Sequence, residues 1–313
     1  MQPQGLGVLY GGLSTALLGI SFVASSTMSD FPHLGGQSVR YAAGFLLLCL
    51  LATRTDRSPL RRLTTRLCLR LAVIAATGLV GMNVSVLQAV RTAEPTVPGV
   101  VVACSPVVVA ALTPLVERRR PAARPVLAAV VVTAGAAVVQ GFGRTDLAGV
   151  LWSVAALAGE VTVMLLIAPA VRALGPMLLS VCVCLLAAVE AGAAGLLLDG
   201  SGWLRTPTGV EAAALAWQAV MVTAVCFLLW FAAVQRIGAQ RMALLTGVAP
   251  VAAALTAPLV GTGAFGLAQL GGSLLVAVGV ALGSSGATSR PAAASRTALP
   301  TADSDTPSDV SGK

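Results

Sequence analysis

Long apolar stretches alternate with short polar connectors along the chain as far as about residue 283. A helix of roughly 17 to 25 apolar residues is long enough to cross the hydrocarbon layer of a bilayer, which is about 30 Å thick. The pattern therefore predicts an all-α integral membrane protein with ten transmembrane helices, at about residues 7–26, 37–53, 69–90, 97–116, 125–142, 147–168, 175–198, 212–234, 242–260 and 267–282. Residues 284–313 are rich in Ser, Thr, Ala, Pro and Asp, which predicts a disordered tail.

An internal repeat organises the apolar stretches. Residues 233–260 align with residues 89–116 when the sequence is shifted by 144 positions without a gap. The shift places Pro250 on Pro106, and this match is informative because only 17 of the 313 residues are proline. The sequence therefore predicts two related five-helix membrane repeats, over residues 5–142 and 147–283.

The composition excludes a soluble domain. Hydrophobic residues make up 57% of the chain and charged residues 10%, with a mean hydropathy of +0.89, whereas a soluble domain is typically about 25% charged. The net charge of +8 does not predict nucleic-acid binding, because aromatic residues are only 4% and the arginines cluster in connectors, where they suit lipid headgroups. The six cysteines lack the spacing of metal ligands or disulfides, so we interpret them as core residues.

The distribution of Lys and Arg predicts the orientation in the membrane. With the amino terminus inside, the cytoplasmic connectors and tail hold sixteen of these residues and the external connectors hold three. Both termini are therefore expected in the cytoplasm, with the chain in the plasma membrane. Because five crossings are an odd number, the second half enters the membrane from the opposite side, and the two repeats are inverted. Inverted repeats that meet at a mid-membrane site are a device of secondary transporters.

Four segments carry recognisable motifs. They are residues 18–23, Arg40 with Tyr41, and the two proline-centred stretches 100–117 and 244–261, of which the first ends in Glu117 and the second in Gly261. In this order they resemble the first helix, the start of the second helix and the fourth helix of each repeat in EamA-type drug/metabolite transporters, where the fourth helix ends in a glutamate. The resemblance covers nearly all of the chain except the tail. It implies a ten-helix carrier of two EamA repeats that moves amino acids, small metabolites or drugs outward.

Two prolines within apolar stretches predict breaks in helical hydrogen bonding. A proline inside a helix removes the hydrogen bond to the carbonyl four residues earlier. Pro106 is therefore expected to free the carbonyl of Val102, and Pro250 that of Thr246. Freed carbonyls in a dry medium need partners. We favour the interpretation that both kinked helices line a transport pathway; a kink satisfied by packing alone is the alternative.

Polar side chains at membrane depth are further pathway candidates. Glu160 and Glu190 lie about two thirds of the way along their helices, where an ionised acid is costly unless it is paired or faces a cavity. Each is a candidate proton relay, and a neutral, hydrogen-bonded glutamate is the alternative. Asn83 and Gln88 are about 140° apart around one helix, so they do not both face one cavity, and helix bridging is their alternative role. Arg40 is a candidate pathway or gate residue through its match to the family.

Together these features predict a secondary transporter that exports small metabolites such as amino acids by alternating access, with proton coupling left open. A multidrug exporter and, in another class, a non-transporting membrane scaffold or sensor are the alternatives. An enzyme is not expected, because the single histidine, His33, lies in a connector and the sequence has no nucleotide-binding glycine motif. We expect no cofactor, metal or nucleic-acid partner. The expected partners are the lipid bilayer and a small-molecule substrate, while protons and a homodimer are left open.

Overall fold

The computed structural model describes residues 3–25, 31–89, 91–93, 96–116, 118, 123–141, 144–256, 258 and 266–284. The regular elements of these residues are all helical. The predicted tail from residue 285 onward and Glu117 lie outside the described residues. The α-helices are α1 (Pro3–Ser25), α2 (His33–Leu51), α3 (Thr65–Val73), α4 (Met82–Ala89), α5 (Thr96–Val102), α6 (Ser105–Val116), α7 (Ala123–Gln140), α8 (Leu147–Asp199), α9 (Gly209–Trp217), α10 (Cys226–Ile237), α11 (Ala239–Leu245), α12 (Val248–Thr256) and α13 (Leu267–Ser284). Two π-helical segments, η4 (Ile74–Gly81) and η6 (Gln218–Val225), join α3 to α4 and α9 to α10, and short 3₁₀ turns are η2 (Ala52–Arg54), η3 (Ser58–Arg62) and η5 (Gly200–Gly202).

The surface of the bundle is apolar, as a membrane protein requires. Large hydrophobic side chains point outward from several helices; Leu46 is 61% exposed and Leu197 is 85% exposed. In water such a surface would drive association, whereas lipid solvates it. Six helical stretches of the described chain are long and apolar enough to cross a membrane, judged by length and composition: His33–Arg54, Thr65–Ala89, Val97–Val116, Ala123–Gln140, Leu147–Gly202 and Gly209–Ile237.

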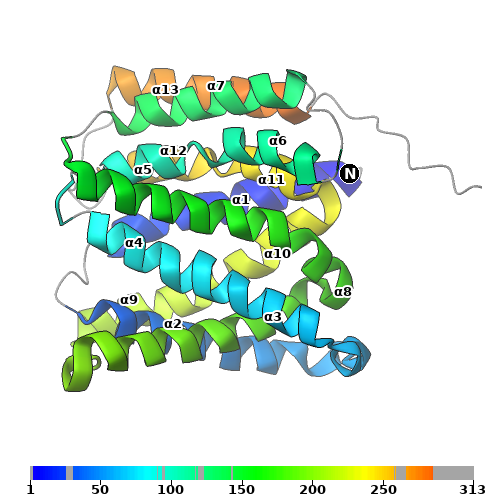
Figure 1. Cartoon of the computed structure of the whole chain (residues 1–313), viewed down its shortest axis with the longest axis vertical. Helices are drawn as coiled ribbons and strands as arrows, with labels where there is room; N and C mark the ends of the chain where they lie inside the picture. Colours follow the sequence, from blue (N-terminus) through cyan, green and yellow to red (C-terminus); the bar gives the residue numbers. More distant parts are fainter. Residues whose placement is uncertain are drawn as a thin grey trace, which may run out of the picture.

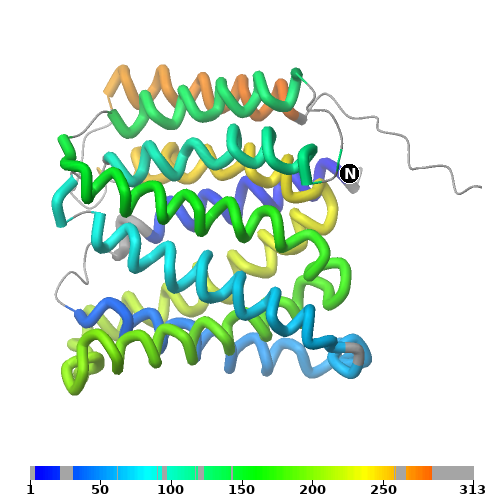
Figure 2. The backbone as a smooth tube through the Cα atoms, in the orientation of Figure 1, coloured from blue at the N-terminus to red at the C-terminus, as the bar shows by residue number. Residues whose placement is uncertain are grey.

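The long helix α8 holds two of the predicted crossings, joined at a sharp bend. Gly175 has φ 73° and ψ 166°, a conformation that a residue with a side chain rarely adopts. Pro176 follows and has no N–H to continue the helical pattern. The chain turns back at this point (Figure 2), so the arms 147–174 and 176–199 run in opposite directions across the bundle.

The helix bounds repeat at the same offset as the sequence. Shifting η4 by 144 positions gives the bounds of η6, and shifting α3 gives those of α9. The same shift takes the described residues of α7 to those of α13. The repeat in sequence is thus accompanied by a repeat in secondary structure, which includes two π-helical segments of equal length.

Helices α7 and α13 lie side by side at one edge of the bundle (Figure 1). A Cβ atom added to Gly135 would lie 2.7 Å from the backbone nitrogen of Val276. At the counterpart position, a Cβ on Gly279 would lie 2.8 Å from the backbone nitrogen of Val132. Higher residue numbers on one helix face lower numbers on the other, so the two helices are antiparallel. Glycine at both positions lets the backbones approach this closely.

Connectors that are predicted to lie on one side of the membrane meet at one end of the bundle. At the end predicted to be external, the guanidinium of Arg205 lies 5.0 Å from the ring centroid of Phe31. At the other end, Nε of Arg124 donates a hydrogen bond of 3.2 Å to the carbonyl of Leu282. Each contact joins two segments that are far apart in the sequence but are predicted to lie on the same side of the membrane.

Candidate functional site

A polar face on the first half of α2 forms the centre of the candidate site. His33, Gln37 and Arg40 follow one another at spacings of four and three residues, so they share one side of the helix. Nη1 of Arg40 donates a hydrogen bond of 3.2 Å to Oε1 of Gln218 on η6. The guanidinium also lies 4.5 Å from the ring centroid of Tyr41, a fully buried residue. Arg40 therefore links two predicted membrane helices rather than extending to the membrane surface.

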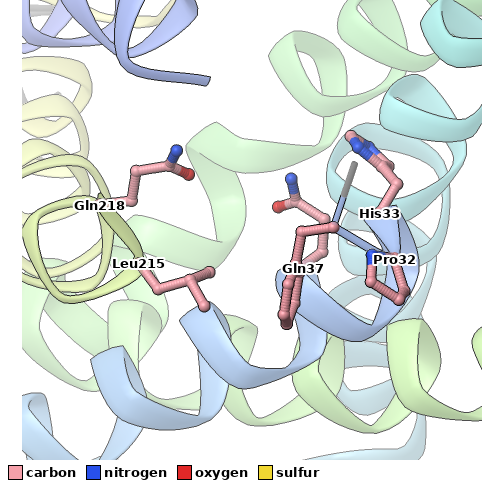
Figure 3. A pocket seen from close by; sticks show the side chains of 7 residues that line it. Pro32, His33, Gln37, Leu215 and Gln218 are labelled. Carbon is pink, nitrogen blue, oxygen red and sulfur yellow. The ribbon is translucent and has the colours of Figure 1, made fainter. Parts of the chain in front are cut away.

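A pocket lies between the start of α2 and the α9–η6 helix. Its lining residues are Phe31, Pro32, His33, Gly36, Gln37, Leu215 and Gln218. Figure 3 shows the amide groups of Gln37 and Gln218 extending from different helices toward the space between them. None of these described lining residues is acidic.

Unpaired polar atoms concentrate on α2 and η6, and two of these atoms belong to His33 and Gln37, which line the pocket. Most buried polar atoms in proteins have a hydrogen-bond partner, so each exception is informative. Within the described chain, five buried side-chain atoms have none, and four of the five belong to α2 or η6. They are His33 Nε2, Gln37 Oε1, Arg40 Nε, Glu190 Oε2 and Thr223 Oγ1.

Close packing below the pocket holds α2 and η6 together. A Cβ atom on Gly44 would lie 2.5 Å from the side chain of Thr223, one helical turn beyond Arg40. The π-helical hydrogen-bond pattern of η6 includes both Gln218 and Thr223, and such segments occur frequently at functional sites.

A salt bridge between Arg205 and Glu211 lies next to Phe31, which lines the pocket. The guanidinium of Arg205 forms two hydrogen bonds with the carboxylate of Glu211, one of them 2.9 Å long. Glu211 and Thr208 form the capping box that begins α9. Because Arg205 also covers the ring of Phe31, the connector after η5 is tied to a residue that lines the pocket.

The two predicted acids lie on different arms of α8. Glu160 is half-buried on the arm 147–174, beside Gly159, where a Cβ would lie 2.5 Å from the carbonyl of Thr77. Glu190 is half-buried on the arm 176–199, with one carboxylate oxygen buried and unpaired. Among the described residues, no hydrogen bond or ion pair joins Arg40 to either acid, so the structure does not bring these three candidates into direct contact.

The amide candidates of α4 lie away from the pocket. Nδ2 of Asn83 donates a hydrogen bond to the carbonyl of Leu79 in its own helix. This bond satisfies a carbonyl where the π-helical pattern of η4 gives way to α4. Gln88 is half-buried, and within the described part of the chain its side chain forms no hydrogen bond. The structure therefore does not bring Asn83 and Gln88 to the pocket.

The two prolines lie where new helices start. Pro106 is the second residue of α6 and Pro250 the third residue of α12, positions where a missing N–H costs little. The expectation that Pro250 frees the carbonyl of Thr246 is wrong, because this carbonyl accepts a hydrogen bond of 3.0 Å from the N–H of Ala249. The Thr246 hydroxyl is also used locally, since it donates to the carbonyl of Ala243 at 2.6 Å.

At the break between α5 and α6, a side chain of another helix supplies the hydrogen bond to a backbone carbonyl. Ala103 lies in the turn between these helices, and its carbonyl accepts a hydrogen bond of 2.9 Å from the hydroxyl of Thr133 on α7. Hydrogen bonds within the protein thus supply a partner for one carbonyl at each break, that of Ala103 and that of Thr246.

Sequence reasoning did not single out Gln37, Gln218 or Thr223. Gln218 and Thr223 are polar residues inside an otherwise apolar stretch, and that contrast was the available signal. Gln37 stands at the predicted start of its helix, where polar residues are common. Only the packing of α2 against η6 brings these side chains together.

Comparison with known proteins supports the transporter interpretation. Residues 5–140 match the model of the EamA-like transporter family, of the drug/metabolite transporter superfamily, which confirms the resemblance noted in the sequence over this part of the chain. A solved structure named only as "Crystal structure of protein" is similar in fold, with a TM-score of 0.73 and 18% identity over 88% of this chain and 96% of that chain. No curated protein sequence matches the chain. The family match and the apolar helices indicate a multi-pass membrane protein.

Proposed function

Since residues 5–140 match the EamA-like transporter family, we propose that the chain is a secondary transporter that exports small metabolites such as amino acids. It works by alternating access, in which two inverted five-helix repeats over residues 5–142 and 147–283 expose one site to either side of the membrane in turn. The chain crosses the plasma membrane ten times, with both termini in the cytoplasm.

The recurrence of helix bounds supports the two-repeat architecture. An offset of 144 residues relates α7 to α13 and η4 to η6. The antiparallel contact of α7 and α13, with Gly135 and Gly279 at counterpart positions, is what two repeats of opposite orientation would produce. The bend at Gly175 supplies the connection between the second repeat's first two crossings.

The link between Arg40 and Gln218 is the observation that carries the transport function. An arginine and a glutamine from different halves, bonded to each other between apolar helices, are expensive in a bilayer and mark a substrate or ion pathway by default. A scaffold that moves nothing has no need of a buried cation beside a pocket. The carboxyl groups of Glu160 and Glu190, at depth on α8, are the proposed means of coupling export to protons.

Flux across reconstituted vesicles tests this function. Metabolites in the medium of cells with and without the gene identify a candidate substrate, and purified protein in lipid vesicles is then tested for uptake of that compound. We expect saturable flux in the wild type and a loss of at least about tenfold in Arg40→Ala, in which the charge-assisted contact is gone. Absence of flux for every compound that differs between the media would refute transport and favour the scaffold or sensor.

A further inference from the structure

The connector between α2 and α3 carries a cluster of arginines at one end of the bundle. The connector contains the turns η2 and η3 and lies beside the start of α3 (Figure 1). Four of the arginines are exposed and the last is half-buried, and their guanidinium groups form no hydrogen bond or ion pair with any residue that the structure describes. These residues, called the arginine cluster below, are Arg54, Arg57, Arg61, Arg66 and Arg70.

The shape of the connector does not depend on the arginine cluster. Leu60 of η3 and Leu71 of α3 pack against the same hydrophobic core. Asp56, the single acid between residues 54 and 70, accepts hydrogen bonds from the N–H and the hydroxyl of Ser58, at 2.9 and 2.6 Å. The hydroxyl of Thr64 caps α3 by accepting from the N–H of Leu67 at 3.3 Å. Apolar packing and short polar side chains thus hold the turn, and the guanidinium groups remain available to a partner.

The second repeat shows that this connector can form without unpaired arginines. The offset of 144 residues relates Thr64, the N-cap of α3, to Thr208, the N-cap of α9. The same offset relates Arg61 to Arg205, but the guanidinium of Arg205 is bonded to the carboxylate of Glu211. The other four positions of the arginine cluster correspond to uncharged residues, Leu198, Ser201, Val210 and Ala214. The unpaired cluster is therefore a property of one end of the bundle and not a requirement of the repeat.

Exposed leucines lie directly beside the arginine cluster. On α2, Leu46 and Leu50 are one turn apart and point outward, Leu50 being 71% exposed, and Arg54 follows about one turn later. On α3, Leu69 is 64% exposed and stands between Arg66 and Arg70 in the sequence. Both helices thus change from apolar to cationic at their exposed surface over about one turn. This is the level at which the hydrocarbon of a bilayer meets the headgroups.

A molecule that fits this surface has acyl chains and a net negative headgroup. The planar fork of a guanidinium pairs with two oxygens of one phosphate. Phosphatidylcholine and phosphatidylethanolamine carry their own cation next to the phosphate, which offsets the attraction, whereas phosphatidylglycerol and cardiolipin do not. Clusters of basic residues next to a transmembrane helix attract anionic lipids, and each cation near the surface strengthens binding about fivefold.

From these features we propose that the arginine cluster is a binding surface for anionic phospholipids in the adjacent leaflet. The guanidinium groups bind the phosphodiester of the headgroup, and Leu46, Leu50 and Leu69 contact the acyl chains. The proposal goes beyond the transport function and does not depend on it, because the cluster faces the lipid at the end of the bundle and flux is not needed to observe binding.

Native mass spectrometry of the purified full-length protein in detergent micelles tests the surface. Palmitoyl-oleoyl phosphatidylglycerol is compared with palmitoyl-oleoyl phosphatidylcholine, which has the same acyl chains. We expect the wild type to bind phosphatidylglycerol at least about tenfold more tightly, since two or more arginines contribute. Glycerol 3-phosphate, which has the phosphate without acyl chains, should not displace the lipid. The orientation of the purified protein is already set, so the assay is separate from any role of the arginines in membrane insertion.

Paired variants locate the binding on the surface. Arg61→Gln combined with Arg66→Gln should weaken binding of phosphatidylglycerol about tenfold and leave binding of phosphatidylcholine unchanged, whereas lysine at both positions should retain most of the affinity. Arg91→Gln combined with Arg144→Gln is the matched control, because it removes the same charge from exposed positions at the other end of the bundle. Circular dichroism and gel filtration verify folding. If the double glutamine variant does not fold, each single variant should weaken binding about threefold to fivefold.

Four results would overturn the surface. The wild type binds both lipids equally, or the glutamine variants at Arg61 and Arg66 keep the wild-type preference. The control variant loses the preference as fully, which would show that overall charge and not the arginine cluster attracts the lipid. Glycerol 3-phosphate displaces phosphatidylglycerol, which would make the ligand a soluble phosphate.

Discussion

Arg40 on α2 donates a hydrogen bond to Gln218 on η6, a residue 178 positions later in the chain. The same two helices also approach closely where Gly44 meets Thr223. One polar contact between otherwise apolar neighbours gives the bundle a specific register at this level, and its removal should affect both stability and ligand binding.

A double-mutant cycle measures that contact. Arg40→Ala, Gln218→Leu and the double variant are compared by their free energies of unfolding in mixed micelles titrated with SDS. We expect a coupling energy of about 1.5 to 3 kcal/mol, because the hydrogen bond has a charged donor and little water near it. Additive effects of the two substitutions would show that the two side chains do not interact in the folded protein.

The α7–α13 contact predicts sharp differences between glycines. Gly135→Ala and Gly279→Ala should each lower the free energy of unfolding by about 1 to 3 kcal/mol, because the new methyl group would meet backbone atoms that cannot move aside. Gly271→Ala on α13 is the control, since a Cβ there has no neighbour within 4 Å, and its higher helix propensity should be neutral or stabilising. If all three substitutions changed the free energy of unfolding equally, the close contact between α7 and α13 at Gly135 and Gly279 would be contradicted.

Orientation can be tested by labelling single cysteines. In a variant without the six native cysteines, Ser58→Cys should be protected from a membrane-impermeant thiol reagent in intact cells, and Ser201→Cys should react. The first position lies in the arginine-rich connector after α2 and the second in η5, and both lie in exposed turns. The reverse pattern would place the amino terminus outside the cell. Reaction at both positions would show that residues 58 and 201 do not lie on opposite sides of the membrane.

The proposed coupling of export to protons can be tested at Glu160. Glu160→Gln removes the titratable group and keeps the shape of the side chain, so we expect it to abolish substrate accumulation driven by a pH gradient in vesicles. Exchange of substrate at equal pH on both sides should persist, because the variant retains the binding site. Accumulation with the wild-type dependence on the pH gradient would remove Glu160 from the mechanism, and facilitated exchange would then explain export.

The start of α8 should make stability depend on pH. Hydrogen bonds from the backbone N–H of Gly149 and the hydroxyl of Thr92 lower the pKa of Asp146, the N-cap residue of this helix. Because the pKa is lower in the folded state, Asp146 stabilises the protein above the ordinary aspartate pKa of about 4, and this contribution is lost as the pH falls through the folded-state value.

Comparison with Asp146→Asn isolates this effect. The melting temperature of the wild type in detergent should exceed that of Asp146→Asn at neutral pH, and the difference should shrink as the carboxylate is protonated. A difference that stays constant down to a pH below the folded-state pKa would show that the charge of Asp146 contributes nothing to capping.

The sequence predicted local features better than contacts between helices. Apolar length located α2, α7 and α13 to within a few residues, because crossing a bilayer imposes a minimum length on each helix. Pro106 predicted a break in the stretch 97–116, which divides at residues 103 and 104. The sequence did not predict that the Thr246 carbonyl is paired, since that depends on a hydrogen bond that forms only after the chain folds. The partner of Arg40 was missed for the same reason.

The constant offset of 144 residues also has an evolutionary consequence. A gene duplication followed by free drift would have left connectors and helices of unequal length, yet the bounds of η4 and η6 still correspond. An inserted residue would rotate the rest of its helix by about 100°, which would turn Gly279 away from Val132, so mutations that change length are harder to tolerate than substitutions. The counterpart of Gln218 is Ile74 and that of Arg40 is Cys184. The polar pair therefore occurs at only one of the two sets of positions that the offset relates.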